Sequence, residues 1–133
     1  MKYLLDTNVC INYLKGLMPC IKDAIHSRHP SQLIICSVVR AEMFFGAMKS
    51  HYPSKCLVSQ QKFLQQFPTL PFNDDAALIF ATIRAHLQRQ GRPIGPYDLQ
   101  IAAIALANDL TLVTHNTREF NRVDGLRLTD WEI

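Results

Sequence analysis

The chain has 133 residues, of which 48% are hydrophobic and 19% are charged, and its formal net charge is +3. This balance excludes a disordered chain, and the length predicts a single domain over residues 1–133. The four cysteines lack zinc-site spacing, the first residues do not resemble a signal peptide, and no apolar run is long enough to cross a membrane. We therefore expect a reduced, cytoplasmic protein without a membrane partner.

The first half of the chain predicts two strands, each followed by a helix. Apolar runs bounded by turn-forming or capping residues are typical of buried parallel strands, and Pro19 can open a helix. The expected elements are a strand at 3–5, helices at 9–15 and about 19–28, a strand at 33–36 and a helix that Ser37 caps.

The second half of the chain continues the alternation. The expected elements are a helix at about 54–66, a strand at 69–71, a long helix that Asn73 or Asp74 caps and Gly91 ends, a buried helix at 98–108, and strands at 111–114 and 126–128. Residues 92–96 are rich in proline and glycine and are expected to form a loop. The alternation predicts an α/β domain with a mostly parallel sheet that helices cover on both faces.

Polar side chains follow three of the predicted strands. Asp6 comes directly after the first strand, Glu42 lies in the helix after the second, Asp98 begins the buried helix, and Asn116 and Glu119 follow a later strand. Because the carboxyl ends of parallel strands meet at one edge, we expect these side chains to lie together there. Grouped carboxylates repel one another unless a cation joins them, and oxygen ligands select Mg²⁺ or Mn²⁺. Such a site supports phosphodiester hydrolysis.

Each of these residues also has a purely structural interpretation. Asp6 is a good helix N-cap, and Asp98 in a first helical turn complements the helix dipole. Asn116 suits a turn, and Glu119 can pair with a neighbouring arginine. Only their joint placement at one sheet edge favours a functional site.

Four segments in order resemble PIN-domain ribonucleases, and specifically the enteric-type VapC toxins of bacterial type II toxin–antitoxin systems. The segments are LLDTNVCINYL, CSVVRAEMFFGA, GRPIGPYDLQIAAIALA and LVTHNTREFNRVDGLRLTDW. The resemblance covers nearly the whole chain. It implies a three-layer α/β/α PIN domain with a central sheet of about four to five strands.

The resemblance implies that Asp6, Glu42 and Asp98 bind the metal. Thr7 and Thr114 match positions whose hydroxyls support such a site, and Asn8 matches the asparagine of the opening triplet of the family motif.

The fourth family position is often an aspartate and falls here on Asn116. Its amide offers a neutral oxygen without charge. Glu119 is the alternative source of the missing carboxylate, and the sequence leaves the choice between the two open.

The resemblance further implies a Mg²⁺- or Mn²⁺-dependent endoribonuclease that cuts tRNA, with the anticodon stem-loop of initiator tRNA as the expected target, and thereby stops translation. A VapB-type antitoxin is the expected partner, with operator DNA bound only through the antitoxin. A toxin homodimer and a higher assembly with the antitoxin are expected. The alternatives are a PIN nuclease that acts on rRNA or another nucleic acid, and a PIN-fold binding module with weak catalysis.

Basic side chains near the acids are candidates for RNA contacts. Lys15, Lys49 and Arg92 can hold phosphates, and Arg92 is favoured because its loop leads to Asp98. Tyr97 is expected to pack beside Asp98, with stacking on a base as the alternative.

Overall fold

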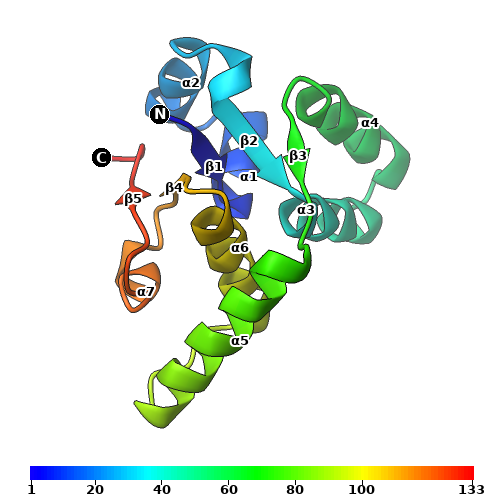
Figure 1. The fold of residues 1–133 in the computed structure, drawn as a ribbon. Helices are drawn as coiled ribbons and strands as arrows, with labels where there is room; N and C mark the ends of the chain where they lie inside the picture. Colours follow the sequence, from blue (N-terminus) through cyan, green and yellow to red (C-terminus); the bar gives the residue numbers. More distant parts are fainter.

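A five-stranded parallel sheet forms the middle layer of the computed structural model, which describes residues 1–133 (Figure 1). The strand order is β3-β2-β1-β4-β5, so β1 lies at the centre, where Leu4 pairs with Ile34 on one side and Leu112 on the other. The predicted α/β class and parallel sheet are confirmed. The strands are β1 Tyr3–Leu5, β2 Leu33–Cys36, β3 Thr69–Leu70, β4 Thr111–Val113 and β5 Leu128–Thr129.

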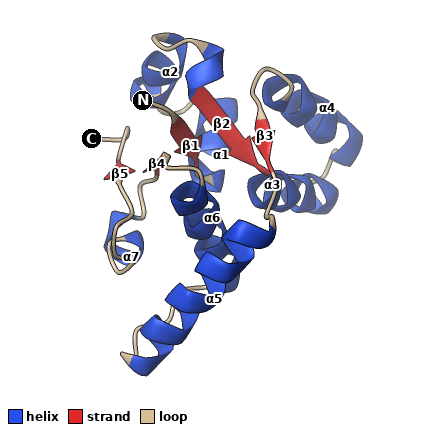
Figure 2. Cartoon of the chain, in the orientation of Figure 1, coloured by secondary structure: helices blue, strands red, loops and turns tan.

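Helices fill the connections between the strands (Figure 2). Parallel crossovers are right-handed, so α1 to α4 lie on one face of the sheet, and α5 to α7 lie on the other because the chain returns past β1 to reach β4. The helices are α1 Thr7–Lys15, α2 Pro19–His26, α3 Ser37–Lys49, α4 Pro53–Leu64, α5 Asp74–Arg89, α6 Pro96–Ala107 and α7 Thr117–Phe120, with a 3₁₀ turn, η1, at Pro30–Gln32.

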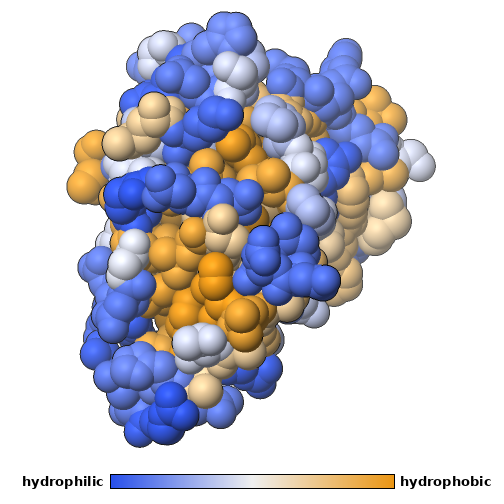
Figure 3. All heavy atoms as spheres, viewed as in Figure 1, coloured by the Kyte–Doolittle hydropathy of each residue, from blue (hydrophilic) through white to orange (hydrophobic).

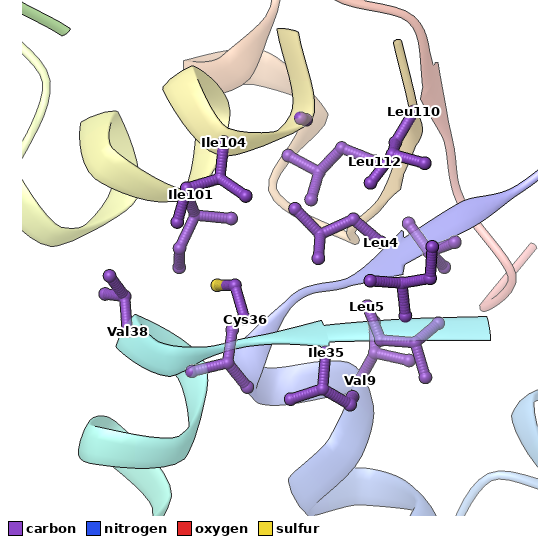
Figure 4. Packing of buried hydrophobic residues seen from close by; sticks show 14 of the residues in the cluster. Leu4, Leu5, Val9, Ile35, Cys36, Val38, Ile101, Ile104, Leu110 and Leu112 are labelled. Carbon is purple, nitrogen blue, oxygen red and sulfur yellow. The ribbon is translucent and has the colours of Figure 1, made fainter. Parts of the chain in front are cut away.

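The core lies on both faces of the short strands. Figure 4 shows Ile101 and Ile104 of α6 on one side of the strands and Val9 of α1 on the other. All three side chains are at most 2% exposed, as are the strand residues Leu4 and Leu5. Burial on both faces explains why these strands are continuous apolar runs rather than alternating ones.

The helix pair α5–α6 extends away from the body of the molecule (Figure 1). The two helices pack along each other, and the middle of α6 from Ile101 to Ala105 is buried, whereas Leu78 of α5 is exposed. Figure 3 shows apolar side chains gathered over α6 and the adjoining side of α5. Ile79, Phe80 and Ile83 of α5 are only partly buried against the core, so the protruding pair keeps an apolar face.

Several element boundaries differ from the prediction because side chains take other roles. The first helix begins at Thr7 rather than residue 9, since the Asp6 carboxylate caps it. Ser37 was expected to be a cap, but Cys36 is the N-cap of α3 and Ser37 is the first helical residue. The Ser37 hydroxyl instead donates to the Leu70 carbonyl at 3.5 Å. The last strand lies at 128–129 rather than 126–128, and η1 and α7 were not predicted.

The two ends of the chain pack against each other. The rings of Tyr3 and Trp131 are 5.4 Å apart, and the Arg28 guanidinium lies 4.6 Å from the Trp131 ring. Trp131 is only 9% exposed, so the C-terminal segment is part of the core. No helix of the structure combines the length and apolar character that crossing a membrane needs.

Candidate active site

Asp6 links the central strand to the first helix. It is the residue directly after β1 and is only 6% exposed. Its Oδ1 accepts the Thr7 backbone N–H at 2.8 Å, and its Oδ2 accepts the Thr114 hydroxyl at 2.8 Å. Asp6 is therefore both the predicted N-cap and a carboxylate held at the carboxyl ends of β1 and β4.

Thr7 connects this junction to α3. Its Oγ1 donates to Glu42 Oε1 at 2.7 Å, while its backbone N–H donates to Asp6. Glu42 lies in the second turn of α3 and is half-buried. One threonine thus positions two carboxylates that lie 36 residues apart in the sequence, as the expected supporting role requires.

Asp98 joins this group from the opposite face of the sheet. It lies in the first turn of α6. Burial, and after it the negative charges of Asp6, Glu119 and Glu42, raise the pKa of the Asp98 carboxyl to about 7. Burial likewise raises the pKa of Asp6, against the lowering effect of its two hydrogen bonds, and the charges of Glu42 and Glu119 add to the rise. The Glu42 and Glu119 carboxylates therefore lie close enough to Asp6 and Asp98 to disfavour ionisation of those two groups.

The structure separates the roles of Asn116 and Glu119. The Asn116 amide Nδ2 donates to Glu119 Oε2 at 2.8 Å, and its backbone N–H donates to the Thr114 hydroxyl at 3.0 Å. The Gly95 N–H donates to Glu119 Oε1 at 3.4 Å. The Glu119 carboxylate thus lies near the other acids, and the Asn116 amide holds its orientation. Glu119 is therefore the candidate for the fourth ligand, and Asn116 hydrogen-bonds it.

The position of these acids in the sheet matches their chemistry. Connections leave β1 and β4 toward opposite faces, and ligands of open α/β sheets bind at the carboxyl edge of such a switch point. The four carboxylates offer oxygen donors, which fit a hard divalent cation. The nearby thiols of Cys10 and Cys36 are poor ligands because burial raises the pKa of both and disfavours the thiolate. A bound cation offsets the repulsion that raises the pKa values of Asp6 and Asp98.

A groove opens beside the acids, between α3 and α6. Its volume is about 520 Å³, and the residues that line it are Ser37, Val38, Ala41, Glu42, Phe45, Tyr97 and Gln100. Tyr97 was expected to pack beside Asp98, but its side chain is 60% exposed and belongs to this groove. The structure therefore does not show Tyr97 packed beside Asp98.

The predicted basic residues and Asn8 have separate surroundings. The Lys49 ammonium lies 4.7 Å from the centre of the Phe45 ring, at the groove. Arg92 is exposed in the α5–α6 loop, six residues before Asp98. Lys15 ends α1 and lines a different hollow, beside α4. Asn8 is exposed in the first turn of α1.

A second charged cluster was missed by sequence reasoning. His115 Nδ1 lies 2.9 Å from Asp130 Oδ2 and 3.1 Å from Glu132 Oε2, and this is the one group of three possible metal ligands whose atoms all lie within 4.8 Å of one another. The Asp130 hydrogen bond raises the pKa of His115, and the two carboxylate charges add to the rise. Both oxygens of Asp130 and Glu132 Oε1 are hydrogen-bonded, Oε1 accepting the Asn12 amide N–H, and Glu132 Oε2 has His115 as its ion-pair partner. The cluster is therefore a satisfied ion-pair network that holds the C-terminal segment, and the more widely spaced acids remain the candidate cation site.

Comparison with known proteins agrees with the fold and the site. The PIN domain family model matches residues 3–126. The chain is 40% identical over 131 residues to the tRNA(fMet)-specific endonuclease VapC of Shigella flexneri and 36% identical to ribonuclease VapC2 of Haemophilus influenzae, covering 98% of both chains in each case. Its fold matches DNA-bound VapBC of Salmonella typhimurium with a TM-score of 0.92 at 37% identity, over 98% of both chains.

This chain belongs to the PIN domain family. Within that family it is a member of the VapC group, to which these full-length relatives belong. The resemblance inferred from the four sequence segments is confirmed.

Proposed function

We propose that this chain is the toxin of a type II toxin–antitoxin pair and acts as a metal-dependent endoribonuclease on tRNA. The observation that carries the proposal is the group of four carboxylates, Asp6, Glu42, Asp98 and Glu119, that meet at the carboxyl edge of the sheet, where burial and the neighbouring charges raise the pKa of Asp6 and of Asp98. Relatives that match along their whole length are named as ribonucleases or tRNA endonucleases. The proposal takes residues 1–133 as one PIN domain.

The proposed roles follow from the contacts. Asp6, Glu42 and Asp98 hold Mg²⁺ or Mn²⁺, and Glu119 adds the fourth carboxylate. Once bound, the cation supplies Lewis-acid activation of water and neutralises charge on the scissile phosphate.

The remaining polar residues position these acids. Thr114 orients Asp6, and Thr7 orients both Asp6 and Glu42 through the hydrogen bonds described above. Asn116 turns the Glu119 carboxylate toward the acids.

The proposed substrate is initiator tRNA, cut in the anticodon stem-loop. Two relatives at 40% and 37% identity carry the name tRNA(fMet)-specific endonuclease. Lys49, which lies beside Phe45, and Arg92, in the loop before α6, are proposed phosphate contacts. Lys15 is a weaker candidate because it lies at the far end of α1 from Asp6. A cytoplasmic location follows from this substrate.

The proposed partner is a VapB-type antitoxin. The support is that similar solved structures are VapBC complexes, two of them with DNA, from Salmonella typhimurium and Rickettsia felis. We extend this to a toxin homodimer within a larger assembly, which touches operator DNA only through the antitoxin.

Purified protein incubated with total tRNA and Mg²⁺ or Mn²⁺ tests the activity. The expected result is a cut in initiator tRNA, mapped by sequencing the new 5′ ends, that chelator abolishes and Asp98→Asn protein does not make. Cuts that cluster in rRNA or other RNA under the same conditions would reject the tRNA assignment. Intact RNA at high protein concentration with either metal would favour the binding-module alternative.

A further inference from the structure

Two aromatic side chains are exposed immediately beside the acids. Phe45 of α3 is 64% exposed and Tyr97 of α6 is 60% exposed, and both line the groove of about 520 Å³. Burying an aromatic side chain lowers the free energy, so exposed aromatic side chains are unfavourable for the isolated chain. Exposed apolar side chains that lie together often mark an interaction site. The groove therefore has the character of a binding surface.

The groove is continuous with the acid site. Glu42 contributes to the groove wall and also accepts the Thr7 hydroxyl that belongs to the acid site. Tyr97 directly precedes Asp98 in the first turn of α6. A polynucleotide whose phosphate reaches the carboxylates therefore places an adjoining nucleotide at this groove.

The lining suits a flat heteroaromatic group with a polar edge. The rings of Phe45 and Tyr97 offer stacking faces, and Gln100 supplies an amide that can both donate and accept hydrogen bonds. The Lys49 ammonium, 4.7 Å from the Phe45 ring centre, brings positive charge to the same place. Proteins that recognise unpaired RNA combine aromatic stacking platforms with nearby cations in this way.

We infer that this groove binds an unpaired nucleobase of the RNA substrate, next to the scissile phosphate, with the base stacked on Tyr97. The inference rests on the proposed ribonuclease function and adds a subsite to it. Because stacking is tolerant of base identity, Tyr97 contributes affinity and register, and Gln100 is placed to read the base edge. A second copy of this chain is the competing occupant of the groove, and the experiment distinguishes the two.

The test is a double-mutant cycle in which one change is made in the enzyme and the other in the RNA substrate. Three RNA hairpins of the anticodon stem-loop are compared: the intact hairpin, one with an abasic site before the mapped cut, and one with an abasic site after it. The value of kcat/KM on each hairpin is measured for wild type, Tyr97→Ala, Tyr97→Phe and Tyr52→Ala. Tyr52 is a matched control because it is 74% exposed and lies away from this groove. We expect Tyr97→Ala to lower kcat/KM about tenfold or more, with Tyr97→Phe and Tyr52→Ala close to wild type. For one of the two abasic hairpins, the wild-type enzyme should show a similarly lowered kcat/KM. Tyr97→Ala should lower kcat/KM on that hairpin only a little more, because the base that stacks on Tyr97 is already missing.

Equilibrium binding separates this inference from the cleavage itself. An RNA hairpin is made with 2-aminopurine at the nucleotide whose abasic form lowers kcat/KM. Its fluorescence should fall when it binds Asp98→Asn protein, and the fall should be much smaller with the Asp98→Asn/Tyr97→Ala protein. Wild-type protein that cuts no RNA would contradict the proposed function, whereas active Tyr97→Ala protein with wild-type kcat/KM would overturn the subsite alone. Independent, multiplying losses from Tyr97→Ala and the abasic site would also overturn it. So would a Tyr97→Ala protein whose molar mass by light scattering shows that a dimer has dissociated, because the groove would then be an interface between copies.

Discussion

At the scale of single residues, Asp6 shows how a capping residue becomes part of a site. Its two carboxylate oxygens are held by different elements, one by the start of α1 and the other by Thr114 at the end of β4. The bond from Thr114 forms only when the ends of β1 and β4 are in register. The orientation of Asp6 therefore depends on the sheet as well as on the helix that it caps.

Removal of the Thr114 hydroxyl tests this orientation. In Thr114→Val protein, Asp6 Oδ2 loses its donor, so the pKa of Asp6 should rise further and Mg²⁺ or Mn²⁺ affinity should fall about tenfold or more. Thr111→Val is the control, since Thr111 is a buried threonine at the start of β4, the strand that leads to Thr114, and its hydroxyl does not contact Asp6. Metal titration followed by thermal shift measures both, and equal affinities would remove Thr114 from the supporting role.

Replacement of Asp98 tests the charge repulsion in the metal-free protein. The native pKa of about 7 is above the ordinary value of 3.8, so the folded state binds this proton more tightly than the unfolded state. The free energy of unfolding therefore falls as pH rises from about 4 through 7, and Asp98→Asn removes this fall. After allowance for solvent screening of a half-buried carboxyl, we expect Asp98→Asn to be about 1–2 kcal/mol more stable at pH 8.

Urea unfolding in chelator at pH 4 and pH 8 measures this effect. The advantage of Asp98→Asn should be present at pH 8 and nearly absent at pH 4. Added Mg²⁺ or Mn²⁺ should stabilise the wild type and do little for the variant. A variant that is less stable at pH 8 would show that Asp98 is held by favourable contacts rather than by a site that awaits a cation.

Some residues of the candidate site could be predicted from the sequence and others could not, for physical reasons. Asp6 and Asp98 follow from strand ends and helix starts, and Glu42 follows from an acid in an apolar helix. The division of roles between Asn116 and Glu119 depends on where one amide group points, and no spacing in the sequence specifies that. The exposure of Tyr97 likewise depends on how far apart α3 and α6 lie.

At the scale of elements, the helix α1 begins at the candidate site, and a specific residue caps each of its ends. Asp6 caps its start, and Gly16 ends it with a left-handed φ of 68° and an N–H that donates to the Tyr13 carbonyl. The strands and long helices were predictable because buried apolar runs and helical spacing are strong signals. The short helix α7 was not, because four residues carry too little pattern and depend on tertiary contacts.

Two glycine substitutions should have opposite effects on stability. Gly16→Ala places a β-carbon in the left-handed region and should lower the free energy of unfolding by about 1 kcal/mol. Gly46→Ala, in the interior of α3, should raise it by about 0.5–1 kcal/mol, because a β-carbon there meets no atom within 4 Å. Denaturant unfolding measures both, and a neutral Gly16→Ala would mean that α1 can end without the left-handed turn.

At the scale of the whole molecule, the C-terminal segment closes the fold over its first strand. Trp131 is the single tryptophan of the chain and packs on Tyr3 and Arg28. We expect Trp131→Ala to lower the free energy of unfolding by about 3 kcal/mol, as large-to-small core substitutions do, whereas Val58→Ala, at an exposed position, should have little effect. Circular dichroism melts measure both variants. Wild-type fluorescence should change at the same temperature as circular dichroism, and an earlier fluorescence change would show that the C-terminal segment detaches separately.

The central position of β1 also has a consequence for how the protein is made. The first strand pairs with β2, which follows it closely, and with β4, which emerges from the ribosome much later. Asp6 and Thr114 are 108 residues apart, a stretch that translation at about 5–20 residues per second covers in roughly 5–20 seconds. A nascent chain during that time has neither the second support of Asp6 nor the Glu119 carboxylate. The group of carboxylates is therefore completed only after Glu119 has been synthesised, near the end of the chain.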